Sequence, residues 1–298
     1  MIRYPITEAE LWRRIETLQP TWRTRTQQRT ADLVAAGRYQ ERSSIWSEIK
    51  SVYMDLQHAK CGYCEKWLEH TDYGSIENDI EHYRPKSSVR AYPPTASSAT
   101  ASGTDARANL TYSFSTGDDG PAGYFHLAYH PLNYLTACKT CNTILKSDYF
   151  PVAATRVTTG GHPHDYDGEQ PFLPYPIGDF DVAPETLIGF EGIFAIPIGT
   201  NEAERRRAEV TIDFFQLNNR EDLRRQRIAI LRALYSVLTA LPHYQSEEMQ
   251  REARQLVDAQ TSPAASHSNF SACFVRLFQA DQNYAARLAH EASNYSIS

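Results

Sequence analysis

Two pairs of cysteines stand out in the sequence, each with two residues between its members: Cys61 with Cys64, and Cys138 with Cys141. Thiolates at this spacing hold one side of a metal ion, and two such pairs supply the four ligands of a tetrahedral zinc site. Four thiolates leave no open position for water, so we expect this zinc to be structural. For the same reason, the ligand set argues against a zinc-dependent hydrolase.

The residues between and beside these pairs suggest a second kind of chemistry. Glu81 and His82 lie on a strand predicted over residues 80–83, and Asn142 opens a helix predicted over residues 142–149. A carboxylate and an amide can hold one hard cation and leave several waters on it, which is how Mg²⁺ is commonly bound. A histidine whose pKa is near neutrality is suited to take a proton from water.

Together with the cysteine pairs, these residues resemble the motif of a known family. The stretch Asn133-Tyr-Leu-Thr-Ala-Cys-Lys-Thr-Cys-Asn-Thr-Ile-Leu-Lys146 resembles the end of the HNH endonuclease motif, Asn-Leu-x-x-x-Cys-x-x-Cys-Asn/His-x-x-Lys. It departs from the motif at Tyr134, and its lysine comes one residue later than the commonest spacing. Glu81 stands where the family more often has aspartate. The resemblance implies a ββα-metal core in which zinc fixes the frame.

The same resemblance implies roles for individual residues. His82 would be the general base that activates water against a phosphodiester. Glu81 and Asn142 would hold one catalytic Mg²⁺ or Mn²⁺, and Asn133 would pin the loop and orient the base.

Two basic side chains near the motif are candidates for binding substrate. Arg84 and Lys146 would contact phosphate, although each can equally be a surface charge.

Three further stretches narrow the resemblance to the PtuB-like group, the HNH endonucleases associated with Septu and retron defence against phage. They are Cys61-Gly-Tyr-Cys-Glu, Ile80-Glu-His-Tyr-Arg-Pro-Lys and Lys146-Ser-Asp-Tyr-Phe-Pro. This group implies a nucleic-acid substrate, DNA before RNA, and an ABC/SMC-like ATPase as partner. The alternative is a non-catalytic zinc module that binds nucleic acid or protein. A purely structural zinc ribbon has no need of Glu81 and His82 beside the cysteines, which distinguishes the two interpretations.

Other histidines compete for roles in the site. His126 and His130 precede the second cysteine pair closely enough for one of them to approach the metal. His162 and His164 lie in a Gly- and Pro-flanked stretch, which is more typical of a turn than of a second metal site.

The charge of the chain does not by itself indicate a nucleic-acid binder, because the formal net charge is −6. Arginines nevertheless gather in residues 13–42 and 205–232. These regions can clamp a polyanion, or they can be solvated helix faces with internal ion pairs. No apolar run is long enough to span a membrane, and the start has no signal-peptide core, so we expect a cytoplasmic protein.

The hydrophobic patterning predicts an α+β protein. We expect a helical region over residues 1–58, a zinc-bound nuclease core over 59–152 and a mixed, then mainly helical, region over 153–298. Pro-, Ser- and Thr-rich composition predicts a flexible insert at about residues 87–123 of the core. Helices are predicted over residues 202–217, 220–241, 246–260 and 269–292.

Overall fold

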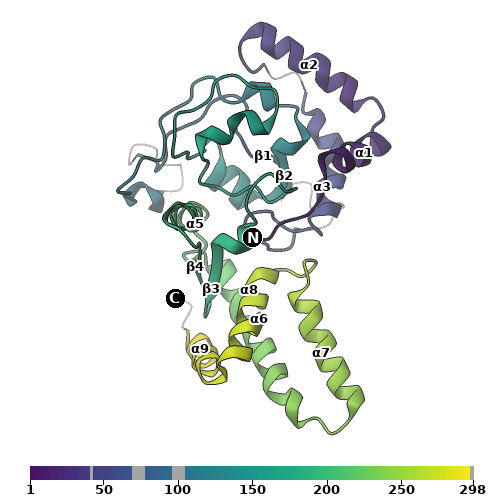
Figure 1. Cartoon of the computed structure of the whole chain (residues 1–298), viewed down its shortest axis with the longest axis vertical. Helices are drawn as coiled ribbons and strands as arrows, with labels where there is room; N and C mark the ends of the chain where they lie inside the picture. The colour runs from purple at the N-terminus through teal and green to yellow at the C-terminus, as the bar shows by residue number, and fades with distance from the viewer. Residues whose placement is uncertain (41–42, 69–77, 96–104, 296–298) are drawn as a thin grey trace.

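The computed structural model describes residues 1–40, 43–68, 78–95 and 105–295. Its helices and two small antiparallel sheets confirm the α+β class (Figure 1). The α-helices are α1 (Glu8–Leu18), α2 (Trp22–Ala36), α3 (Lys50–Leu56), α4 (Pro184–Leu187), α5 (Glu202–Phe214), α6 (Glu221–Ala240), α7 (Glu247–Thr261), α8 (Ser268–Ala280) and α9 (Gln282–Asn294). Short 3₁₀ segments are η1 (Ile45–Ile49), η4 (Ala106–Asn109), η5 (Phe125–Leu127), η6 (Pro131–Asn133), η8 (Pro163–Glu169) and η9 (Leu241–His243), and η7 (Thr140–Lys146) is a π-helical turn.

The sheet that carries the candidate site pairs β1 (Asn78–His82) with β2 (Tyr134–Cys138). The strand expected at residues 80–83 is therefore present, with Ile80 opposite Thr136. The side chain of Gln57 at the end of α3 donates to the Thr136 carbonyl and accepts from its amide, at 2.9 and 2.7 Å. This double hydrogen bond fixes α3 against β2, just ahead of the second cysteine pair.

The helix after β2 begins earlier than expected. It was predicted over residues 142–149, but η7 starts at Thr140 and ends at Lys146, so Cys141 lies within it. The turn closes where the amide of Ser147 donates to the Asn142 carbonyl at 2.7 Å. Ser147 has a positive φ of 43°, which stops the helix. Cys141, Asn142 and Lys146 are thus carried by one helical turn.

The larger hydrophobic core runs from Met1 to Leu223 and surrounds the first sheet. Aromatic side chains fill its centre, and Tyr134 contacts both Trp22 of α2 and Tyr53 of α3 edge to face. The Tyr53 hydroxyl also donates to the Pro131 carbonyl at 2.7 Å. The N-terminal helices are therefore packed directly on the sheet, while the division at residues 58 and 152 stays a prediction.

The described parts of the expected insert are packed onto this core. Val89 and Gly120 exchange backbone hydrogen bonds of 2.8 Å, which joins the two ends of the segment. Arg107 is buried and donates to the carbonyls of Leu145 and Phe214. Residues 96–104 of the predicted flexible stretch lie outside the described residues.

The C-terminal helices form a second core. Ile228, Leu231 and Phe274 are among the residues that pack α6 against α8, and α9 closes the cluster. Figure 1 shows this part below the body that holds β1 and β2. A hairpin of β3 (Ile188–Glu191) and β4 (Phe194–Pro197) lies between the two.

The last predicted helix is wrong in one respect. Residues 269–292 form two helices rather than one, because the chain leaves the helical conformation at Asp281. The Asp281 carboxylate then accepts from the amide of Tyr284 at 2.9 Å and caps α9.

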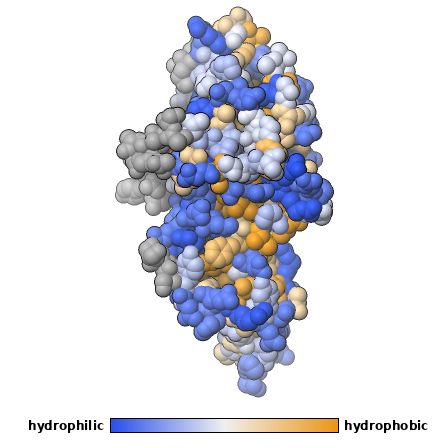
Figure 2. All heavy atoms as spheres, turned by 90° about the vertical axis from the view of Figure 1, so that its left-hand side faces the viewer, coloured by the Kyte–Doolittle hydropathy of each residue, from blue (hydrophilic) through white to orange (hydrophobic). Residues whose placement is uncertain are grey.

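Among the described residues, none of the helices combines the length and the apolar character that a bilayer crossing requires. Figure 2, which views the molecule from the left-hand side of Figure 1, shows mostly hydrophilic surface with apolar atoms gathered near its middle.

Candidate active site

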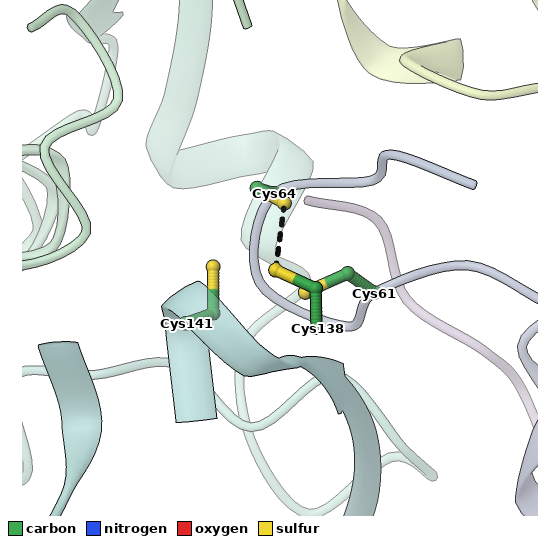
Figure 3. Close-up of side chains that lie close together, drawn as sticks. All are labelled: Cys61, Cys64, Cys138 and Cys141. Atoms are coloured by element: carbon green, nitrogen blue, oxygen red, sulfur yellow. Dashed lines mark hydrogen bonds between the residues drawn. The ribbon is translucent and has the colours of Figure 1, made fainter. Parts of the chain in front are cut away.

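The four paired cysteines come together as one buried group (Figure 3). Their sulfur atoms all lie within 4.8 Å of one another, and the Sγ atoms of Cys64 and Cys138 are 3.9 Å apart. Zinc–sulfur bonds of about 2.3 Å in a tetrahedron separate the sulfurs by about 3.8 Å. All four thiols are free of disulfides. The group can therefore bind a metal such as zinc, as the cysteine spacing predicted.

A guanidinium that is paired with the Asp222 carboxylate contacts the cysteine group. Arg220 Nη1, at the start of α6, donates to Cys141 Sγ at 3.1 Å. Burial acts to lower the pKa of the Arg220 guanidinium, but the charges of Cys141 and Cys64 outweigh it and raise that pKa. A guanidinium in contact with a cysteine sulfur stabilises the thiolates, because four of them carry more negative charge than one divalent cation neutralises.

Glu81, His82 and Asn142 border one cleft of about 750 Å³. The two adjacent strand residues reach the same cleft even though neighbouring side chains on a strand alternate. His82 is the last residue of β1, and there the chain turns. The remaining lining residues are Ser44, Trp46, Ser47, Lys50, Asp79, Ile80, Pro85, Lys86, Ser87, Ser147 and Asp148.

The imidazole of His82 is held on three sides. Its Nε2 lies 3.1 Å from the Ala128 carbonyl, and the edges and faces of Trp46 and Tyr134 meet the ring at centroid distances of 4.8 and 5.0 Å. A carbonyl only accepts, so Nε2 carries the proton and Nδ1 keeps a lone pair. Burial, with the charge of Lys86, holds the pKa of His82 well below its usual value. The ring is therefore neutral at pH 7.

Glu81 is buried beside a buried lysine. Its Oε1 lies 3.2 Å from Lys146 Nζ, but no hydrogen bond of good geometry reaches that oxygen. Burial raises the pKa of the Glu81 carboxyl to about 7, against the opposing charge of Lys146. Lys146 Nζ also donates to the His82 carbonyl at 3.5 Å. A buried carboxylate oxygen without a hydrogen bond is a natural position for a cation.

The two asparagines lie in different surroundings. The Asn142 side chain borders the cleft, is partly buried and makes no hydrogen bond within the described parts of the chain. Asn133 is buried, and its side chain accepts from the Arg84 amide at 2.8 Å and donates to the Arg84 and Leu127 carbonyls, each at 3.1 Å. Asn133 thus ties the backbone after β1 to the turn before β2.

Arg84 and Lys146 are placed differently from the surface positions that phosphate contact would require. Both are buried, at 3% and 0% exposure. The Arg84 guanidinium pairs with the Glu169 carboxylate and donates to the Tyr166 carbonyl at 3.3 Å, outside the cleft of His82. The sequence did not reveal this because Glu169 lies 85 residues away.

The other histidines lie outside the cleft. His126 stacks on Phe125, whereas His130 and His162 meet Glu8 of α1 in one cluster. Both rings accept a backbone amide at Nδ1, from Leu132 and from His164, so their protons are on Nε2, which faces Glu8 at 3.7 and 3.0 Å. Metal-binding histidines donate from the second nitrogen instead. The cluster therefore fits a hydrogen-bonded group better than a metal site.

Sequence reasoning missed three residues of the cleft. Trp46 and Lys50 come from η1 and α3, far from the cysteine pairs, and Lys86 Nζ lies over the rings of Trp46 and Tyr39 at 4.8 and 5.2 Å. Trp46 and Lys50 lie in the helical region predicted over residues 1–58, and no motif in that region marks them as cleft residues.

The comparisons with known proteins add one relationship to this geometry. The chain is similar to the Septu protein PtuB of Bacillus mycoides (strain KBAB4). The two are 25% identical over 219 residues, which cover 70% of this chain and 63% of the relative. The chain thus spans less than two thirds of that protein's length. No protein-family model matches the chain, and neither does any solved structure.

Proposed function

We propose that this chain is a metal-dependent HNH endonuclease that hydrolyses phosphodiester bonds of nucleic acid in defence against phage. One observation carries the proposal: an oriented histidine and a buried carboxylate, whose Oε1 accepts no well-aligned hydrogen bond, border the same cleft. The similarity to a Septu protein supports the defence role. DNA is the first candidate substrate and RNA the second.

His82 is the general base in this proposal. Its Nδ1 takes a proton from water as the water oxygen bonds to phosphorus, and the bond from phosphorus to the 3′ oxygen breaks. The Ala128 carbonyl keeps the opposite ring nitrogen protonated throughout. A phosphate in the cleft adds negative charge near the imidazole, which raises the pKa of His82 towards neutrality and makes it a better base.

Glu81 and Asn142 would hold the catalytic cation, Mg²⁺ or Mn²⁺. Oxygen ligands of this kind suit a hard cation, and a cation at Glu81 would share its carboxylate with the Lys146 ammonium. The cation would stabilise negative charge on the phosphate and on the departing oxygen. Asn133 fixes the turn that positions His82, and Lys50 and Lys86 add positive charge to the cleft.

We further propose that the chain acts in the cytoplasm with an ABC/SMC-like ATPase subunit, as the PtuB-like resemblance implies. The second candidate function is a non-catalytic zinc module. The buried cysteine group is equally compatible with both candidate functions. The non-catalytic module, however, does not explain why Glu81 and His82 border one cleft.

The test compares the wild type with His82→Ala on plasmid DNA and on RNA, each with Mg²⁺, with Mn²⁺ and without added cation, alone and with the partner ATPase. We expect cation-dependent cleavage by the wild type and a loss of at least a hundredfold in the variant, within the range of general-base contributions. His126→Ala is the matched control, because this histidine lies outside the cleft.

Zinc content and thermal unfolding of each variant show whether the fold is kept. Equal cleavage by His82→Ala and wild type would exclude His82 as the base. Absence of cleavage in every condition, with nucleic acid still bound, would favour the non-catalytic module.

A further inference from the structure

A second depression lies on the other side of η7 from the cleft. Its volume is about 390 Å³, and its lining includes Lys66, Trp67, Cys138, Lys139 and Ile144. Trp67 is 55% exposed and Ile144 is 58% exposed. Two large apolar side chains are therefore exposed at one depression, and neighbouring exposed apolar side chains mark candidate contact surfaces.

The backbone under Trp67 is held firmly. Trp67 forms a β-bridge with Lys60. The flanking residues are hydrogen-bonded as well: the Cys61 amide donates to the Lys66 carbonyl at 3.0 Å, and the Leu68 amide donates to the Ala59 carbonyl at 2.8 Å. This hairpin also carries Cys61 and Cys64. The cysteine group therefore fixes the base from which the indole projects.

Two lysines line the depression. Lys139 is exposed and makes no ion pair within the described parts of the chain, and Lys66 lies 3.8 Å from Asp222 as its nearest acidic partner. No acidic side chain is among the described lining residues. A flat aromatic ring flanked by lysines is the arrangement that binds a base and its phosphate in single-stranded nucleic acid.

The depression and the cleft share one element. Asn142 of η7 borders the cleft, whereas Thr140 and Ile144 of the same turn border the depression. Two sides of one helix are separated by about 10 Å. One strand of nucleic acid can therefore reach both.

We propose that Trp67, Lys139 and Ile144 form a subsite in which an unpaired base of the substrate stacks on the indole while its phosphate meets Lys139. This inference rests on the proposed nuclease function and adds to it a preference for a substrate with a single-stranded segment. Trp67 is then a residue that determines substrate choice, apart from the residues that perform hydrolysis.

The experiment measures binding in a His82→Ala background, so that the probes stay intact. The probes are fluorescein-labelled 20-nucleotide oligothymidylate, oligouridylate of the same length and a 20-base-pair DNA duplex, followed by anisotropy. We expect Trp67→Ala to weaken binding of the single strands roughly tenfold, as for one lost stacking contact, and to change duplex binding less than twofold. Trp67→Phe should restore most of the affinity.

Two further variants sharpen the test. Lys139→Ala should lower the salt dependence of single-strand binding by about one phosphate contact, a slope change of about 0.7. Leu256→Ala, which removes an exposed apolar side chain from α7, should leave all affinities unchanged. Zinc content checks that each variant keeps its fold.

Unchanged single-strand affinity in Trp67→Ala would overturn the proposed subsite. That result is the one expected if this surface binds a protein instead of nucleic acid. Equal losses on single strands and duplex would overturn the preference for an unpaired base. If the wild type cleaves nucleic acid in either case, the proposed function stands and only this inference fails. If the parent binds no probe and the wild type cleaves nothing, both fail.

Discussion

Lys146 Nζ lies 3.2 Å from Glu81 Oε1, and the two side chains are buried together in the wall of the cleft. The lysine comes from η7 and the glutamate from β1, so the pair joins the helical turn to the sheet. Burying either charge alone is far more costly than burying both. The pair therefore links the position of the helical turn to the ionisation of Glu81.

Removing the lysine charge should destabilise the protein. We expect Lys146→Met to lower the free energy of unfolding by about 3 kcal/mol, because Glu81 is left buried without its partner. Urea unfolding followed by circular dichroism measures the change. The double variant Glu81→Gln/Lys146→Met should lose clearly less than the sum of the single losses, and additive losses would show that the ion pair contributes nothing.

Removal of the cysteine-bound metal should show that this metal stabilises the fold and is distinct from the catalytic residues. We expect about one tightly bound zinc per chain, and a lower unfolding temperature after chelation or in Cys138→Ser, because metal binding to such sites is part of the folding free energy. Metal analysis and calorimetry provide the measurements. His82→Ala should keep its zinc, and a Cys138→Ser protein with unchanged stability would contradict a structural metal.

Trp46 should control the basicity of His82. Burial is the main cause of the lowered pKa of His82, and the indole covers one side of the ring at a centroid distance of 4.8 Å. Trp46→Ala admits water, so the pKa of His82 should rise towards 6.5. Proton NMR titration of the imidazole measures it, with His126 as an internal reference. A pKa that stays low would assign the shift to the lysines instead.

His267 should make the folded protein less stable as the pH falls below about 6.5. Burial, followed by the charge of Arg227, lowers the pKa of His267 to about 4. Between pH 4 and 6.5 the unfolded chain therefore binds more protons at this position than the folded one, whereas the raised pKa of Glu81 acts in the opposite direction. The stabilising effect of the neutral ring is complete above pH 6.5 and is lost progressively as the pH falls, by about 3 kcal/mol in total. Burial also lowers the pKa of His130 to about 4, which acts in the same direction.

Urea midpoints at pH 7, 6 and 5 measure this dependence. His267→Gln keeps a hydrogen-bonding side chain beside Gln226 and should flatten the profile. Identical profiles for the two proteins would show that His267 does not titrate in this range.

Arg84 should matter for stability rather than for substrate. Its guanidinium is buried against Glu169, and the Tyr124 hydroxyl also donates to that carboxylate at 3.0 Å. We expect Arg84→Met to lower the free energy of unfolding by about 3 kcal/mol and to leave nucleic-acid affinity within twofold. A large loss of nucleic-acid affinity in a stable Arg84→Met protein would instead support the hypothesis from the sequence that Arg84 contacts phosphate.

Local spacing made part of this structure predictable. The spacing of the cysteine pairs predicted their cluster, and the strand predicted over residues 80–83 overlaps β1. The N-terminal helices were also visible, because apolar residues such as Leu11 and Ile15 recur at helical spacing.

Long-range contacts were not predictable in this way. The buried state of Arg84 depends on Glu169, and the hold on His82 depends on Trp46 and on the Ala128 carbonyl. The residues next to His82 in the sequence do not indicate which distant groups contact its ring. The break at Asp281 was missed because apolar periodicity continues on both sides of it, and a single capping carboxylate decided the outcome.

The π-helical turn of η7 accounts for one irregularity of the sequence. The interval from Cys141 to Lys146 is one residue longer than in the motif it resembles. A π-turn closes hydrogen bonds over five residues instead of four, as Ser147 and Asn142 do here, and so takes up one inserted residue. Lys146 therefore still lies next to Glu81, although the interval in the sequence is one residue longer. The extra residue is compensated within a single coil of backbone, so the length of this interval can vary while the ion pair across the cleft wall is kept.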